Sequence, residues 1–236
     1  MISLTLRLTA GMPQKKFRPL AARLISLRLA KITSAVLLLS SLLWGACLGQ
    51  NFFLVLVIYL AIQLLYNYRL KEIVILDVFC ISAGFFLRVI AGAVVIQVQI
   101  SHWLIICTIS ISMFLALAKR RHELVLLGEA EARNHKKILS KYSPHVLDQM
   151  IGVITASALL SYMLYCVSPV TIQSFGTDHL IYSFPFVLYG IFRYLYLMHK
   201  KDRGGPPEKV LVSDRPLMLD VILWAFFCML IIYGVI

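Results

Sequence analysis

The sequence predicts an all-α fold, a polytopic membrane helix bundle of about seven transmembrane helices. Sixty per cent of the 236 residues are hydrophobic and only 14% are charged, whereas soluble domains average about 25% charged residues. The mean hydropathy is +0.85. The chain also contains seven apolar runs, each close to the roughly 20 residues that a helix needs to cross a bilayer.

The first two runs are short and are separated by Gly49, Gln50 and Asn51, which favours a helical hairpin with a tight turn. The third run carries Asp77 and Arg88. The expected spans are roughly 32–48, 51–66, 74–96, 102–118, 149–168, 181–198 and 217–235.

Charged segments delimit the later runs. The fourth run ends where Lys119 opens a basic triplet, which is typical of a stop-transfer anchor. Charges mixed with Leu and Ile at helical spacing then continue to Asp148, and a long segment of this kind often acts as a lid or binding element. Snorkelling explains Arg193 near the end of the sixth run. The turn signal at 204–207 precedes the seventh run.

The basic residues predict the orientation. Of the 23 Lys and Arg residues, seven lie at 1–31, two at 69–71, seven at 119–141 and five at 200–215. The connections near 49–50, 97–101 and 169–180 hold none. This alternation is the positive-inside pattern, and it predicts a cytoplasmic N-terminus. The membrane that we expect is the inner (plasma) membrane. Since the net charge of +12 is scattered over these loops, we expect no nucleic-acid partner.

Asp77 and Arg88 are the most informative residues of the third run. An ionisable side chain near the bilayer centre costs roughly 2.5–3.5 kcal/mol, so such residues usually face a protein-lined or water-filled cavity. Helical periodicity places Asp77, Gly84 and Arg88 on one face, with the two charges about 16 Å apart along the axis. They cannot neutralise each other, and each therefore needs another partner.

Four long segments, in order, now resemble one family. They are LK-x5-D-x10-R-x3-G from Leu70, FLALAKRRHEL at 114–124, PFVLYGIFRYLYL at 185–197 and GGPPEKVLVSDRPL at 204–217. Together they resemble the UbiA-type prenyltransferase superfamily and, within it, the decaprenyl-phosphate phosphoribosyltransferases. The resemblance covers residues 13–236 as a single transmembrane domain and leaves residues 1–12 as a non-matching leader.

The resemblance implies transfer of 5-phosphoribose from phosphoribosyl pyrophosphate to a polyprenyl phosphate such as decaprenyl phosphate, with magnesium. The product would feed arabinose donors for the cell wall. Lys71, Arg88 and Lys119 would bind phosphates, and Lys15 matches the family's P-x-K-x-x-R-P element. On a straight helix Lys71 and Arg88 would be about 25 Å apart. Binding of one donor by both requires a bend, near Gly84 for instance, or a folded-back loop around Lys71.

One family feature is missing. The aspartate motif N-D-x-x-D-x-x-x-D is expected just before Pro13, but residues 1–12 read MISLTLRLTAGM and Asp77 is the first aspartate. We therefore expect a family member that begins late, lacks the first helices and the main metal ligands, and has little or no activity; Asp77 is a weak substitute ligand.

Two other functions remain open. One is UbiA-type transfer of a prenyl group to an aromatic acceptor. The other is a non-catalytic, truncated membrane protein that binds lipid phosphate.

Overall fold

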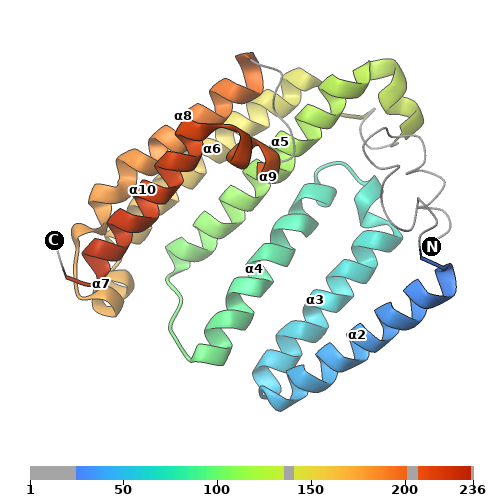
Figure 1. Ribbon diagram of the computed structural model, residues 1–236, viewed down its shortest axis with the longest axis horizontal. Helices are drawn as coiled ribbons and strands as arrows, with labels where there is room; N and C mark the ends of the chain where they lie inside the picture. The colour runs from blue at the N-terminus through green and yellow to red at the C-terminus, as the bar shows by residue number, and fades with distance from the viewer. Residues whose placement is uncertain (1–24, 136–140, 201–206, 235–236) are drawn as a thin grey trace. The chain divides into compact units, whose positions relative to one another are not determined.

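The computed structural model describes residues 25–135, 141–200 and 207–234, and every regular element among them is helical. The elements, labelled in Figure 1, are α2 (Leu27–Cys47), α3 (Gln50–Tyr68), η1 (Leu70–Glu72), α4 (Leu76–Ile96), α5 (His102–His135), α6 (Pro144–Cys166), α7 (Pro169–Phe175), η3 (His179–Ser183), α8 (Phe184–Lys200), α9 (Pro207–Ser213) and α10 (Arg215–Ile232).

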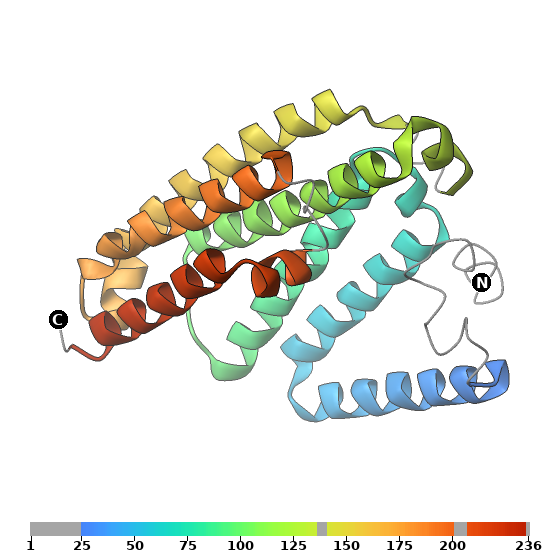
Figure 2. The same ribbon diagram turned by 45° about the horizontal axis from the view of Figure 1, so that its top comes forward.

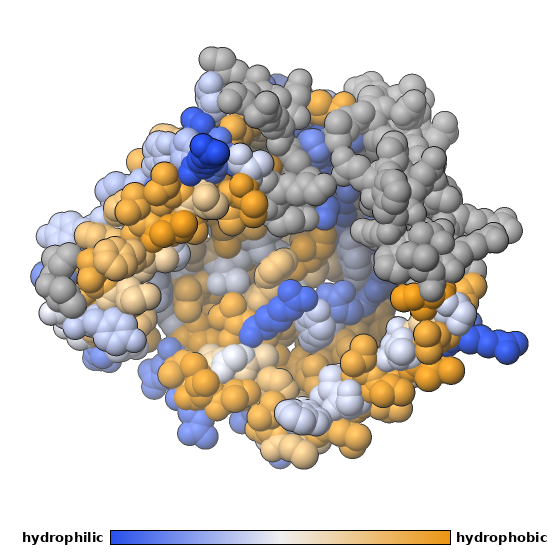
Figure 3. Space-filling model, viewed as in Figure 1, coloured by the Kyte–Doolittle hydropathy of each residue, from blue (hydrophilic) through white to orange (hydrophobic). Residues whose placement is uncertain are grey.

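Seven helical segments are long and apolar enough to cross a membrane, which confirms the prediction of an all-α bundle with about seven spans. They are Leu27–Cys47, Gln50–Tyr68, Leu76–Ile96, His102–Val125, Pro144–Cys166, His179–His199 and Arg215–Ile232. Large apolar side chains are exposed along these helices, and apolar residues cover much of the face seen in Figure 3. Lipid is the solvent that suits such a surface.

Polar side chains begin several helices. The side chains of Ser26, Ser143 and Asp214 accept hydrogen bonds from backbone N–H groups three residues later, at 3.2, 3.3 and 3.0 Å. These are N-caps, which satisfy backbone donors that have no partner within the helix. Proline in the first turn of α6 and α10 supports the same starts, because its missing N–H would be unpaired there.

The chain forms two compact units, and their boundary lies within α3, after Ile58. In the first unit, α2 and α3 form the predicted hairpin. Gly49 in the turn has a φ of +117°, a conformation that glycine adopts without steric cost. Gly45 lets the two helices approach closely, since a Cβ atom there would lie 2.6 Å from Cδ2 of Leu56.

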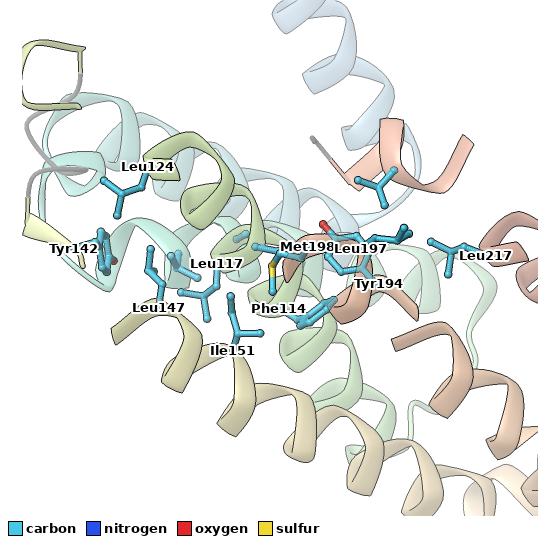
Figure 4. Close-up of a cluster of buried hydrophobic side chains, with 14 residues drawn as sticks. Phe114, Leu117, Leu124, Tyr142, Leu147, Ile151, Tyr194, Leu197, Met198 and Leu217 are labelled. Atoms are coloured by element: carbon cyan, nitrogen blue, oxygen red, sulfur yellow. The ribbon is translucent and has the colours of Figure 1, made fainter. Parts of the chain in front are cut away.

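The second unit, Tyr59–Ile236, contains α4 to α10. Helix α5 packs against both α4 and α6, and α8 packs against α6 and α10 (Figures 1 and 2). Figure 4 shows the central hydrophobic cluster, to which α5 contributes Phe114 and Leu117, α6 contributes Leu147 and Ile151, and α8 contributes Tyr194.

Helix α5 continues well past 118, where the sequence predicted the span to end. It reaches His135, so the basic triplet at Lys119 does not terminate the helix. The helical spacing of apolar residues after the triplet explains the extension, because Leu124 is 2% exposed within the hydrophobic cluster. The predicted lid segment is therefore helical over its first half.

Candidate phosphate-binding site

The chain enters α4 through a sharp break rather than as a straight helix. Lys71 lies in the short η1 turn, and Ile75 has φ 71° and ψ −46° immediately before α4 begins. Helix α4 is then continuous through Gly84. Lys71 therefore lies in a turn outside α4 and not on a straight extension of it, and α4 itself has no break at Gly84.

Asp77 is fully buried in the first turn of α4 and has partners from two other elements. Its Oδ2 accepts a hydrogen bond from Nε of Arg120 on α5 at 2.8 Å, and its Oδ1 accepts one from the hydroxyl of Tyr142 at 3.0 Å. Arg120 is 7% exposed and also donates to Glu123 at 3.1 Å. The predicted need of Asp77 for a separate partner is met by this network.

Tyr142 joins the same network to the backbone. Its hydroxyl oxygen accepts a hydrogen bond from the N–H of Ile75 at 2.7 Å while its proton goes to Asp77. Burial raises the pKa of Tyr142 to about 12; the Asp77 charge raises it further, and the Ile75 N–H opposes the change. The phenol therefore remains a hydrogen-bond donor across the physiological pH range.

Arg88 lies thirteen residues into α4 and is satisfied differently. Its Nη2 donates to the hydroxyl of Tyr59 on α3 at 2.8 Å. The guanidinium carbon lies 5.5 Å from the ring centroid of Tyr59 and 5.2 Å from that of Phe85, within cation–π range. Arg88 is exposed, and no carboxylate within the described residues pairs with it. Its remaining N–H donors are available to an anion.

The three residues that were predicted to share one face of α4 contact different neighbours. A Cβ atom on Gly84 would lie 3.1 Å from Nε2 of Gln63, so Gly84 and Arg88 both face α3. Asp77 instead pairs with Arg120 and Tyr142.

Lys119 and Lys71 lie at the same level of the second unit. Lys119 is exposed, whereas the adjacent Arg120 is buried and contacts the first turn of α4. Lys119 is therefore level with the start of α4, and thus with the η1 turn that carries the half-buried Lys71. Lys15 lies outside the described residues.

The sequence did not predict two further ion pairs. Arg193 on α8 makes a two-point contact with Asp214, both distances being 3.0 Å, so pairing rather than snorkelling explains it. Arg121 on α5 pairs with Asp148 on α6, which His199 on α8 also contacts at 3.2 Å. The partners are 21 to 51 residues apart, and no local pattern signals them.

The carboxylates of the described residues do not make a metal site. No group of three His, Cys, Asp or Glu side chains gathers anywhere in the part of the chain that the structure describes. Asp77 has both oxygens engaged by Arg120 and Tyr142.

Comparison with known proteins gives consistent matches. Residues 10–218 match the UbiA prenyltransferase family. The decaprenyl-phosphate phosphoribosyltransferase of Corynebacterium glutamicum is 30% identical over 94% of this chain and 67% of its own length. The proteins of that name from Mycolicibacterium smegmatis and Mycobacterium tuberculosis are 29% and 31% identical, each over 90% of this chain and 68% of their own length.

Proposed function

The chain belongs to the UbiA prenyltransferase family, and we propose that it transfers 5-phosphoribose from phosphoribosyl pyrophosphate to a polyprenyl phosphate such as decaprenyl phosphate. The observation that carries this proposal is the 29–31% identity to decaprenyl-phosphate phosphoribosyltransferases over at least 90% of the chain. The product would feed arabinose donors for cell-wall glycans.

The proposed reaction is a substitution at C1 of the ribose. A phosphate oxygen of the lipid forms the new bond to C1 while the bond from C1 to pyrophosphate breaks, and pyrophosphate leaves with the electron pair. No redox step occurs. Positive charge develops on the ribose ring and negative charge on the leaving group, so cationic donors aimed at the phosphates stabilise the transition state.

The positions of the cations support separate roles for them in binding the two substrates' phosphates. Lys71 and Lys119, level with the start of α4, would hold the phosphates of the soluble donor through charge-assisted hydrogen bonds. Arg88 lies deeper in the span, with free N–H donors beside Tyr59, and would bind a phosphate that enters between the helices. Lys15 is proposed as a fourth cation from the family motif.

The membrane placement follows from the basic connections. We propose that the end of the helices bearing Lys71 and Lys119 faces the cytoplasm, where a soluble, highly charged donor is present. The lipid phosphate would reach the same end from the inner leaflet of the plasma membrane. Both substrates would then meet at the level of α4's first turns.

UbiA family prenyltransferases generally use a divalent metal. We propose magnesium as the ion, because it binds phosphate oxygens together with few protein ligands. The described residues provide no cluster for it, and the roles of Lys71, Arg88 and Lys119 are argued without it.

A transfer assay tests the proposal. The purified chain in lipid nanodiscs receives radiolabelled phosphoribosyl pyrophosphate, decaprenyl phosphate and magnesium, beside the same chain preceded by a relative's segment that carries N-D-x-x-D-x-x-x-D. We expect labelled lipid, at a higher rate in the version that carries the aspartate motif, because its carboxylates can hold the metal ion. A parallel reaction contains a prenyl diphosphate and an aromatic acceptor. Prenylated acceptor without labelled lipid would contradict the proposal.

A further inference from the structure

A buried polar network joins the two elements that carry the lysines, the start of α4 just after the Lys71 turn and α5 at the residue after Lys119. Its members are Asp77, Arg120 and Tyr142. We propose that these three are positioning residues, which hold Lys71 and Lys119 in place for a polyanionic phosphate ligand. This inference rests on the proposed function, since it assumes that the two lysines bind phosphate.

The first observation is the strained turn between Lys71 and α4. Ile75 is β-branched, yet it has φ 71° and ψ −46°, a conformation that L residues rarely adopt. Such strain persists only where surrounding contacts fix it, and it concentrates at functional sites. At Ile75 the fixing contact is the 2.7 Å hydrogen bond from its N–H to the hydroxyl of Tyr142.

The second observation is how many elements meet at Asp77. The carboxylate receives Arg120 from α5 and Tyr142 from the segment before α6. Tyr66, near the end of α3, also lies close to Arg120 and Asp77. The turn that carries Lys71 thus lies between Tyr66, which is close to this buried carboxylate, and Ile75, which is joined to it through Tyr142.

The third observation concerns the adjacent residues Lys119 and Arg120. Successive residues of a helix point about 100° apart. Because Arg120 is held inward by Asp77 of α4, this contact limits rotation of α5 and leaves Lys119 on the exposed surface. The same contact therefore orients both lysine-bearing elements.

Stability alone is a poor explanation of this network. A buried ion pair often adds little to stability compared with apolar residues of similar size, because both charges lose their hydration. Asp77 is 0% exposed and Arg120 is 7% exposed, so both charges of this pair have lost their hydration. Unlike an apolar contact, the pair makes hydrogen bonds of fixed geometry, and these orient the two helices that it joins.

The test removes one hydroxyl. Tyr142→Phe deletes the acceptor for the Ile75 N–H and the donor to Asp77 but keeps the ring in the core. We expect phosphoribosyl pyrophosphate to bind about threefold to tenfold more weakly, because both hydrogen bonds that fix the turn are lost. The matched control is Tyr182→Phe, which removes the hydroxyl of an exposed tyrosine and should bind as the parent does.

A second change separates positioning from simple loss of stability. Glycine adopts positive φ freely, so Ile75→Gly lets the turn keep its shape without the tyrosine hydroxyl. We expect the double variant Ile75→Gly with Tyr142→Phe to recover most of the parent's affinity. A purely stabilising role for Tyr142 predicts no such rescue, because glycine restores no contact that the lost hydroxyl made.

A ligand-free measurement reports on the turn itself. In a background without the five native cysteines, spin labels replace Glu72 and Val146, which are both exposed. We expect a narrow distance distribution in the parent, a broad one in Tyr142→Phe and a narrow one again in the double variant.

The outcomes are distinguishable. Unchanged affinity in Tyr142→Phe, or an unchanged label distribution, overturns the positioning role even if the parent binds the ligand well. Weakened binding by Lys71→Ala, with none by Tyr142→Phe, leaves the proposed function standing and removes this inference alone. A parent chain that binds no phosphoribosyl pyrophosphate overturns both.

Discussion

The two charged residues of α4 show how differently a membrane-spanning helix can accommodate a charge. Asp77 is completely buried and is neutralised by Arg120, whereas Arg88 relies on the hydroxyl of Tyr59 and two aromatic rings. Sequence periodicity predicted that each needed a partner. It could not identify Arg120 or Tyr142, which lie 43 and 65 residues away from Asp77 with no pattern that links them.

The buried pair should show strong coupling in a double-mutant cycle. Asp77→Leu or Arg120→Met alone leaves one buried charge without its partner, and we expect each to destabilise the protein by about 3–5 kcal/mol. The double variant should recover most of that loss, because neither member of the Asp77–Arg120 pair is then left without the other. Urea unfolding in a mild detergent measures both, and strictly additive losses would show that the two side chains act independently.

Tyr142 should make the protein sensitive to alkali. Its pKa is raised to about 12 in the folded protein, against about 10 in an unfolded chain. The folded state therefore holds the proton more tightly, and the stabilisation is complete below pH 10 and is lost as the pH rises towards 12. This difference in the pKa of Tyr142 between the folded and unfolded states corresponds to about 3 kcal/mol of stability.

The measurement is the unfolding free energy at pH 9 and pH 11.5. We expect the parent to lose more stability between these values than Tyr142→Phe, which has no proton to release at this site. Tyr182→Phe serves as the control, and equal losses in all three proteins would refute this assignment of the alkaline transition.

At the scale of elements, apolar runs predicted the helices well and their ends less well. The basic triplet at Lys119 suggested an end to the fourth span, but Arg120 and Arg121 find carboxylates on neighbouring elements, so α5 continues. The break at Ile75 was also not predictable. Isoleucine ordinarily disfavours positive φ, and only the tertiary contact with Tyr142 explains it.

The α2–α3 hairpin yields a packing prediction. Gly45→Leu should destabilise the hairpin, since even a Cβ atom at Gly45 would lie 2.6 Å from Leu56. Gly152→Leu on α6 is the matched control, because nothing lies within 4 Å of a Cβ atom there. We expect thermal unfolding in detergent to begin at a lower temperature in the first variant only. An equal decrease in both would mean that helix propensity, not close packing, decides the effect.

At the scale of the whole molecule, composition and motif order predicted the bundle and its family. Seven apolar runs led to seven candidate spans, and four ordered motifs led to the UbiA family. The candidate site was predictable only as a set of cations. Which of them are exposed, which are paired and which lie at one level depends on packing between helices distant in sequence.

The orientation is testable by cysteine labelling. Single cysteines replace Lys141 or Asp178 in a background lacking the native cysteines. If the basic connections are cytoplasmic, a membrane-impermeant reagent should label position 178 in intact cells and position 141 only after the membrane is opened. Labelling of position 141 from outside would reverse the proposed orientation.

The most direct test of the central claim is binding of phosphoribosyl pyrophosphate to the purified chain in nanodiscs. Lys71→Ala, Arg88→Ala and Lys119→Ala each remove a charge-assisted contact worth about 1.5–3 kcal/mol. We therefore expect each to weaken binding roughly tenfold to a hundredfold, while Lys31→Ala, an exposed lysine of α2, leaves it unchanged. Parental affinity in all three site variants would contradict the account.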